Sequence, residues 1–395
     1  MATVRWASLP EHLRAMPFNL RFMGFIGLWG PRREICKFLV PLIFATMVIM
    51  FPKVVFGIGS SDATAICKGV AEFIFELSNF VTLVILALKR TALERLIQEL
   101  EDFVREVAIG EESKECYDMI CKQNYKMRKV FNFLVHYCAY GTLGFWLPSF
   151  LISHYRFWTN SDPLILELPM EQEFYWLQIR TNFADYHIFM GFSLIAYAIC
   201  AFFELLKVST TCFIIRYSAL TFRLVAAKIK TLPQITEDES RTEVHVEDLK
   251  KVVELHRKAF GITELIEEIC QLPVALEFFF CIIFWCLSMF KKVDLNLINV
   301  MIIFGLSLAQ VFGYSYLGSQ LTEEADAVGK AIYDLHWYEH SIELQRFYRL
   351  IIQRTQRPTG ITGATFFIVQ RTTFASVVQM SYSYYLVLKD VLNKL

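Results

Sequence analysis

Two histidines and a glutamate at residues 336–340 form the pattern H-x-x-E-H, which holds zinc in some metalloproteases. On a helix, His336 and His340 would lie four residues apart on one face and could bind the metal, with Glu339 as the general base. A hydrolytic site also needs a further ligand and an open coordination position, and no third ligand is identifiable in the sequence. We therefore favour the alternative, in which these aromatic and polar side chains pack where helices meet.

Three glutamates lie within otherwise apolar segments. Glu72 and Glu76 are four residues apart and would share a helix face, and Glu277 lies in a later segment. A carboxylate at membrane depth is costly, so such residues often mark an ion path or a polar pocket. The alternative is that the first two glutamates reach interfacial water or pair with Lys53 or Lys68.

Aromatic residues and a glycine in the apolar segments are candidates for a pocket that takes a small apolar molecule. The predicted ligand-binding residues are Phe73, Phe80, Tyr137, Tyr140, Gly141, Phe145, Trp146, His187, Phe189 and Phe312. For any one of them taken singly, we favour contact with lipid or packing against another helix. As a set, they predict a small, neutral, aromatic ligand.

The last apolar segment is polar for a helix that faces lipid. Ser376, Gln379 or Met380, Ser383, Val387 and Val391 fall on one helical stripe, and Tyr384 follows Ser383. Several chains around an axis could line a pore with this stripe, closed by a valine constriction that gates ions by dewetting. Alternatively, the hydroxyls bond their own backbone or a neighbouring helix.

Composition and motifs exclude several classes of protein. The 39 Lys+Arg balance the 39 Asp+Glu, so nothing suggests nucleic-acid binding. No G-x-S-x-G, Walker A motif or catalytic carboxylate pair occurs, so we expect neither an enzyme nor a cofactor. A G-protein-coupled receptor is disfavoured, because no D-R-Y or N-P-x-x-Y motif stands at the expected places.

Apolar residues make up 55% of the 395 residues and recur in long uncharged stretches. Crossing roughly 30 Å of hydrocarbon takes about 20 mostly apolar residues in a helix. The sequence therefore predicts an all-α polytopic membrane protein with seven transmembrane helices, at 38–58, 69–88, 130–153, 186–206, 269–290, 295–322 and 372–392.

The distribution of basic residues orients these spans. Of the 39 Lys and Arg, thirty lie before the first span or in alternate connections, and six lie in the opposite connections. Positive charge concentrates on the cytoplasmic side. We therefore expect a cytoplasmic N-terminus and an extracellular C-terminus.

The cytoplasmic connections carry helical periodicity. Residues 91–107, 245–269 and 341–356 place apolar side chains on one face, so we expect helices that extend beyond the bilayer and pack there. The stretch 231–244 lacks periodicity and is predicted to be a mobile loop.

Several short motifs in the last third of the chain resemble those of the insect odorant receptor family. They are Tyr314-Ser-Tyr-Leu-Gly318, Glu323-Glu324, Ala331-Ile-Tyr333, His336-Trp-Tyr338, Gly363-Ala-Thr-Phe-Phe367, Phe374-Ala-Ser-Val377 and Ser381-Tyr-Ser-Tyr-Tyr385. Their order and spacing are specific together. The resemblance at motif level covers about residues 310–392.

This resemblance implies a ligand-gated, non-selective cation channel in the plasma membrane of sensory neurons. A tuning subunit assembles with a shared co-receptor, usually as a heterotetramer, and the last helix of each subunit lines the pore. Val387 and Val391 would form the apolar gate, with Ser383 and Tyr384 beside it. A small volatile odorant would bind in the outer half of the bilayer.

The co-receptor has similar motifs, but its second cytoplasmic connection is much longer and an apolar run replaces Lys389 and Asp390. The chain therefore resembles a tuning subunit. We expect residues 1–325 to form helices one to six with the ligand pocket, and 326–395 to form a cytoplasmic anchor helix and the pore helix. The alternatives are a homomeric gustatory-type channel and a membrane metalloenzyme using the 336–340 pattern.

Overall fold

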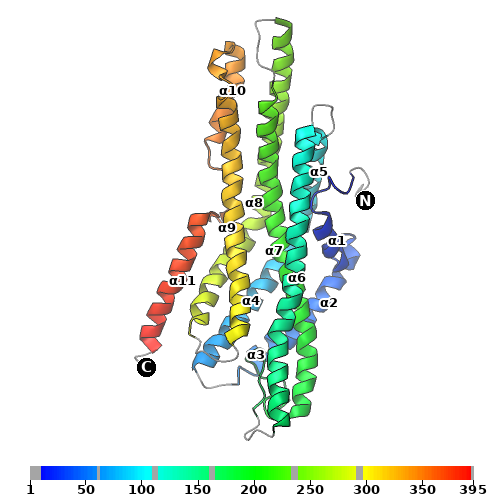
Figure 1. Cartoon of the computed structure of the whole chain (residues 1–395), viewed down its shortest axis with the longest axis vertical. Coiled ribbons are helices and arrows are strands. Elements are labelled where there is room, and N and C mark those ends of the chain that lie inside the picture. Colours follow the sequence, from blue (N-terminus) through cyan, green and yellow to red (C-terminus); the bar gives the residue numbers. More distant parts are fainter. Residues whose placement is uncertain are drawn as a thin grey trace.

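The computed structural model describes residues 10–59, 63–108, 114–159, 165–232, 239–290 and 297–392. It is an elongated helical bundle in which α6, α7, α8 and α9 run along the long axis (Figure 1). The helices are α1 (Pro17–Phe25), α2 (Cys36–Ala45), α3 (Phe51–Val55), α4 (Ala63–Leu88), α5 (Arg90–Ala108), α6 (Lys114–Trp158), α7 (Phe183–Lys230), α8 (Glu239–Ser288), α9 (Leu297–Tyr333), α10 (Ile342–Thr355) and α11 (Arg371–Leu392). Short 3-10 turns lie at Arg32–Ile35 and Trp337–Glu339, and two strands, β1 (Thr362–Gly363) and β2 (Phe367–Ile368), pair antiparallel.

All seven predicted spans fall mainly in helices; the first and the fifth run a few residues past the ends of α3 and α8, and residues 295–296 of the sixth lie outside the described chain. Five stretches of the described chain are long and apolar enough to cross a membrane: Cys36–Val55, Ala65–Leu88, Phe183–Lys230, Val246–Ser288 and Asn299–Glu339. The other two spans lie in α6 and α11. Those two helices are less apolar because they carry tyrosines together with histidines or serines. The prediction of an all-α polytopic membrane protein is confirmed.

The predicted extension 245–269 is continuous with the spanning part of α8. At 1.5 Å per residue, the 50 residues of α8 reach about 75 Å, against roughly 30 Å of hydrocarbon. The predicted helix 91–107 corresponds to α5, whose apolar face is buried as its spacing predicts. The helix predicted at 341–356 corresponds to α10.

The loop predicted at 231–244 is wrong in its second part. Helix α8 begins at Glu239, so residues 239–244 are helical, while residues 233–238 lie outside the described chain. An amphipathic pattern is not required there, because adding residues to an existing helix is far easier than nucleating one. The buried turn at Leu249 supplies the packed part from which the helix extends.

The first span contains a π-helical turn at Thr46–Met50 followed by Pro52. Proline has no N–H to donate to the carbonyl four residues earlier, that of Val48. In the π turn the N–H of Phe51 bonds the carbonyl of Thr46, which leaves the carbonyl of Met47 without its usual partner. The loop between α6 and α7 satisfies both freed carbonyls: Gln172 donates to the oxygen of Val48 at 3.2 Å, and Tyr175 donates to that of Met47 at 2.9 Å. The loop is thereby attached to this helix.

The hairpin of β1 and β2 joins α10 to α11 and packs on α8 and α9. The backbone N–H of Thr362 donates to the Glu267 carboxylate at 2.8 Å, and that of Ala364 donates to the Gln271 carbonyl at 3.1 Å. On α9, Gly318 lies directly beneath the Val369 carbonyl, where a Cβ atom would overlap the oxygen. This close approach sets the start of α11 against α9.

We expect Gly318→Ala to lower the melting temperature of the purified protein, because the added methyl forces the hairpin away from α9, at about 1–3 kcal/mol. The matched control is Gly305→Ala in the same helix, where nothing lies within 4 Å of the added Cβ. That change should be neutral or slightly stabilising. Equal melting temperatures for the two variants would contradict the close packing at Gly318.

Candidate functional site

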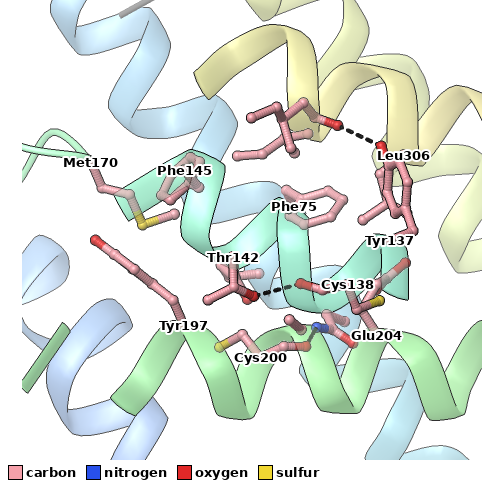
Figure 2. A pocket seen from close by; sticks show the side chains of 16 residues that line it. Phe75, Tyr137, Cys138, Thr142, Phe145, Met170, Tyr197, Cys200, Glu204 and Leu306 are labelled. Atoms are coloured by element: carbon pink, nitrogen blue, oxygen red, sulfur yellow. Dashed lines mark hydrogen bonds between the residues drawn. The ribbon is translucent and has the colours of Figure 1, made fainter. Parts of the chain in front are cut away.

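A cavity that is partly open to the surroundings lies between α4, α6, α7 and α9. Figure 2 shows its side chains, and Met170 of the α6–α7 loop contributes from one end. Its lining is mainly apolar, with a few polar groups, as in small-molecule sites. Its lining residues are Phe75, Glu76, Asn79, Tyr137, Cys138, Gly141, Thr142, Phe145, Met170, Tyr197, Cys200, Ala201, Glu204, Ile302, Ile303 and Leu306.

Helical periodicity brings these residues together. Tyr137, Gly141 and Phe145 are successive turns on one face of α6, and Tyr197 and Glu204 are two turns apart on α7. In Figure 2, Tyr197, Cys200 and Glu204 follow one another along α7, across the cavity from Met170 and Phe145. The wall formed by α4 and α7 is therefore rich in polar groups, and the opposite side is mainly apolar.

Three of the predicted ligand-binding residues line this cavity: Tyr137, Gly141 and Phe145. The Tyr137 hydroxyl donates to the Ile302 carbonyl at 3.5 Å, which ties α6 to α9 beside the cavity. A Cβ on Gly141 would lie 3.9 Å from Ile302, so the glycine leaves space without being sterically required. Their contact with a ligand stays a prediction.

The other predicted residues lie outside the cavity lining. Phe80 packs edge-on against Phe203, and Phe189 is fully buried against Phe174. Trp146 donates to the Met190 carbonyl at 3.0 Å.

The remaining four predicted ligand-binding residues are more exposed. Tyr140 is 70% exposed and Phe312 is 49% exposed. His187 lies on the bundle surface, with its Nε2 3.1 Å from that of His154, and Phe73 is half-buried on α4. Their role in binding ligand likewise stays a prediction.

Sequence reasoning missed most of the polar wall. Selecting aromatic residues by type overlooked Asn79, Thr142 and Glu204, of which the first two lie three residues from Glu76 and Phe145. Glu76 was recognised as a candidate for a polar pocket, and it lines this cavity. The usable signal was its spacing to Asn79, since residues three apart lie on the same face.

A buried ion cluster lies beside the cavity. The Lys207 ammonium is 2.7 Å from Glu204 and 3.1 Å from Glu277, and all three side chains are almost fully buried. Ser78 donates to the same Glu277 oxygen at 3.0 Å. These contacts join α4, α7 and α8, and removing one partner of such a group leaves an uncompensated buried charge.

A second ion network joins α3, α4 and the α6–α7 loop. Glu72 lies 2.7 Å from the Lys53 ammonium and 3.8 Å from that of Lys68, and Lys68 lies 3.0 Å from Glu171. The pairing of Glu72 with these lysines, one of the two alternatives for this residue, is therefore what the structure shows. Burial alone would raise the pKa of Glu171, but the charges of Lys68 and Arg180 bring it below its ordinary value.

The H-x-x-E-H pattern does not lie on a regular helix. His336 has the left-handed φ of 51°, a 3-10 turn follows it, and His340 has extended backbone. The His340 ring lies 3.2 Å from the Tyr348 hydroxyl. In the described ranges no group of three or more His, Cys, Asp or Glu side chains is placed to hold a metal ion. Trp337 packs against the hydrophobic core, whereas His336, Tyr338 and Glu339 are exposed, so the favoured packing interpretation holds for the tryptophan.

Helix α11 is covered by the rest of the chain along a narrow stripe. Val377 and Ser381 are buried, whereas Val387 is 61% exposed and Val391 is 51% exposed. The Ser376 and Ser383 hydroxyls donate to backbone carbonyls one turn earlier. In Figure 1 α11 lies at the edge of the bundle, and Tyr385 in its C-terminal half contacts Phe290 just after α8, with ring centroids 5.0 Å apart. The helix thus has satisfied hydroxyls and a large free face.

A family model described as 7tm Odorant receptor matches residues 62–382, which is most of the chain. This protein belongs to the odorant receptor family. The resemblance inferred from the last third of the sequence is thereby confirmed and extended toward the N-terminus as far as residue 62, which is just before α4. As a family of receptors, it offers no support for an enzymatic activity.

Curated odorant receptors match over part of their length. The odorant receptor coreceptor of Drosophila melanogaster is 31% identical over 145 residues, which is 35% of this chain and 30% of that protein. The putative odorant receptor 92a of the same species is 26% identical over 150 residues, 37% of each chain. The matches thus span about a third of these relatives.

A solved structure shows the same fold. The insect olfactory receptor OR5 from Machilis hrabei in complex with eugenol superposes with a TM-score of 0.75 at 15% identity, covering 94% of this chain and 96% of that chain. At this identity, the likeness concerns the arrangement of helices. It includes the long helices that wall the cavity, since almost the whole chain is covered.

The Glu171 contacts predict a pH-dependent contribution to stability. The folded-state pKa lies below the ordinary value of 4.5, so the stabilisation is fully present above that value and is lost as the pH falls through the lowered one. We expect Glu171→Gln to lower the melting temperature at neutral pH, with a difference from wild type that shrinks below pH 4.5. Glu173→Gln, whose carboxylate is 3.9 Å from Arg180, is the control and should have a smaller effect. A difference that does not vary with pH would argue against the ion pairs.

Proposed function

We propose that this odorant receptor is a ligand-binding subunit of a non-selective cation channel that it forms with the shared odorant co-receptor. The observation that carries the proposal is the cavity between α4, α6, α7 and α9, whose mainly apolar and aromatic lining with a few polar groups is typical of a small-molecule site. A similarly folded receptor was solved with eugenol, a small molecule. The natural ligand would be a small volatile odorant.

Binding would rest mainly on burial of the ligand's apolar part. Phe75, Phe145 and Ile303 offer apolar surface to the cavity, and aromatic rings add edge and face contacts. Burying about 100 Å² of apolar ligand surface contributes about 2.5 kcal/mol. To open a channel, the ligand must bind the open state more tightly than the closed one.

The free face of α11 supports a pore role for this helix. Val387 and Val391 are exposed in the single chain, an arrangement that other subunits around an axis would cover. We assign these valines to an apolar gate and Ser383 and Tyr384 to the adjacent pore lining. Residues 1–325 then form the ligand-binding part, and residues 326–395 form the anchor and pore part.

The proposed location is the plasma membrane of sensory neurons, with the N-terminus cytoplasmic and the C-terminus extracellular. The excess of Lys and Arg in one set of connections supports this orientation. The tuning role is supported by Lys389 and Asp390 near the end of α11, where the co-receptor is expected to be apolar.

The test of the proposed function is whole-cell current during exposure to a panel of small volatiles, with this chain alone, the co-receptor alone, and both together. We expect panel-evoked current in the pair, because the ligand cavity of this chain and the pores of both subunits are needed. Current from this chain alone would instead indicate a homomeric, gustatory-type channel. No response in the pair, with both chains at the surface and the co-receptor's own agonist active, would contradict the proposal.

Phe145→Ala should raise the concentration for half-maximal response to an aromatic agonist by about tenfold, because losing contact with a buried ring costs on the order of 1–2 kcal/mol. The matched control is Phe133→Ala, also on α6 but 66% exposed. Its response should stay within about twofold of wild type. The cavity would be the wrong site if Phe133→Ala shifted the response and Phe145→Ala did not.

A further inference from the structure

The polar wall of the cavity carries hydrogen-bond acceptors that the described protein leaves unused. Oε2 of Glu76, Oδ1 of Asn79 and Oε1 of Glu204 have no hydrogen-bond partner within the described ranges, although the three side chains are at most 5% exposed. All three residues line the cavity. A buried polar atom without a partner is expensive, so this wall is suited to a ligand that supplies donors.

The orientation of the Asn79 amide follows from its own hydrogen bond. Its Nδ2 donates to the Cys200 carbonyl at 3.3 Å, which leaves the oxygen as the unused atom. Glu76 lies one turn earlier on α4, so both acceptors belong to the same helix face. The Tyr197 hydroxyl also lacks a partner in the described chain. Its single proton could satisfy only one of these acceptors.

Buried carboxylates outnumber buried ammonium groups around this wall. Glu76, Glu204 and Glu277 are buried together with the single ammonium of Lys207, which already contacts two of them. The next lysine, Lys53, lies 2.7 Å from Glu72. Of the buried carboxylates, Glu76 thus has no ion pair with a described residue, and an added cation would compensate it.

We propose that the cavity binds a small primary amine in its protonated form, with the ammonium at Glu76 and Asn79 and an apolar, aromatic body against Phe75 and Phe145. An ammonium supplies three N–H donors and the missing positive charge. A hydroxyl of the same size supplies one donor and no charge. The inference rests on the proposed function, because it names the ligand class of the same cavity.

The direct test is equilibrium binding of tritiated 2-phenylethylamine to the full chain in lipid nanodiscs, with 2-phenylethanol and propylbenzene as competitors of similar shape. We expect the amine to bind at least tenfold more tightly than either neutral compound. Glu76→Gln, which keeps the shape and removes the charge, should weaken amine binding tenfold or more and leave competition by the alcohol within about threefold. Glu99→Gln on α5, 46% exposed at its side chain, is the matched control and should bind the amine as wild type does.

The comparison of amine with alcohol in the wild-type chain needs no variant, so it stands even if Glu76→Gln fails to fold. Equal affinity for amine and alcohol, absence of saturable amine binding, or unchanged amine affinity in Glu76→Gln would each overturn the inference. Current measurements on the chain with its co-receptor distinguish failure of the amine inference from failure of the proposed function. Current evoked by neutral volatiles without amine binding would reject the amine alone, whereas tight amine binding without current from any volatile would support the amine site and reject the channel role.

Discussion

A buried charge is costly unless an opposite charge compensates it, and the ion pairs that meet this requirement join the helices of the receptor. Lys207 meets Glu204 and Glu277 in a cluster that joins α7 to α8, with Ser78 adding α4. These contacts hold the helices together on one side of the cavity. With α4, α7 and α8 held in this arrangement, space remains toward α6 and α9, where apolar residues line the opposite wall of the cavity.

The same constraint explains how the α6–α7 loop is held. The π turn and Pro52 free two backbone carbonyls of the first span, and Gln172 and Tyr175 satisfy them. Glu171 adds ion pairs to the same segment. Because this loop also carries Met170 into the cavity, groups that satisfy the backbone of the first span also position part of the proposed ligand site.

Much of the fold followed from patterns that local physics imposes on the chain. Apolar length predicted the seven spans, since a helix must cross a fixed thickness of hydrocarbon. The apolar face of α5 was predicted because its period matches the helix repeat. The start of α8 at Glu239 was not predicted. An exposed helix end needs no amphipathic pattern, whereas residues 231–244 were assigned to a loop because they lack such a pattern.

The sequence by itself determined the helices, the family motifs and a list of aromatic candidates, of which Tyr137, Gly141 and Phe145 line the cavity. Only the tertiary structure decided which face of each helix turns inward, because a membrane helix that is apolar on most sides has no amphipathic signal to fix its rotation. That rotation placed Tyr140 on the surface and Glu76 in the cavity. It is set by ion pairs and close contacts between residues far apart in the chain, which no local pattern records.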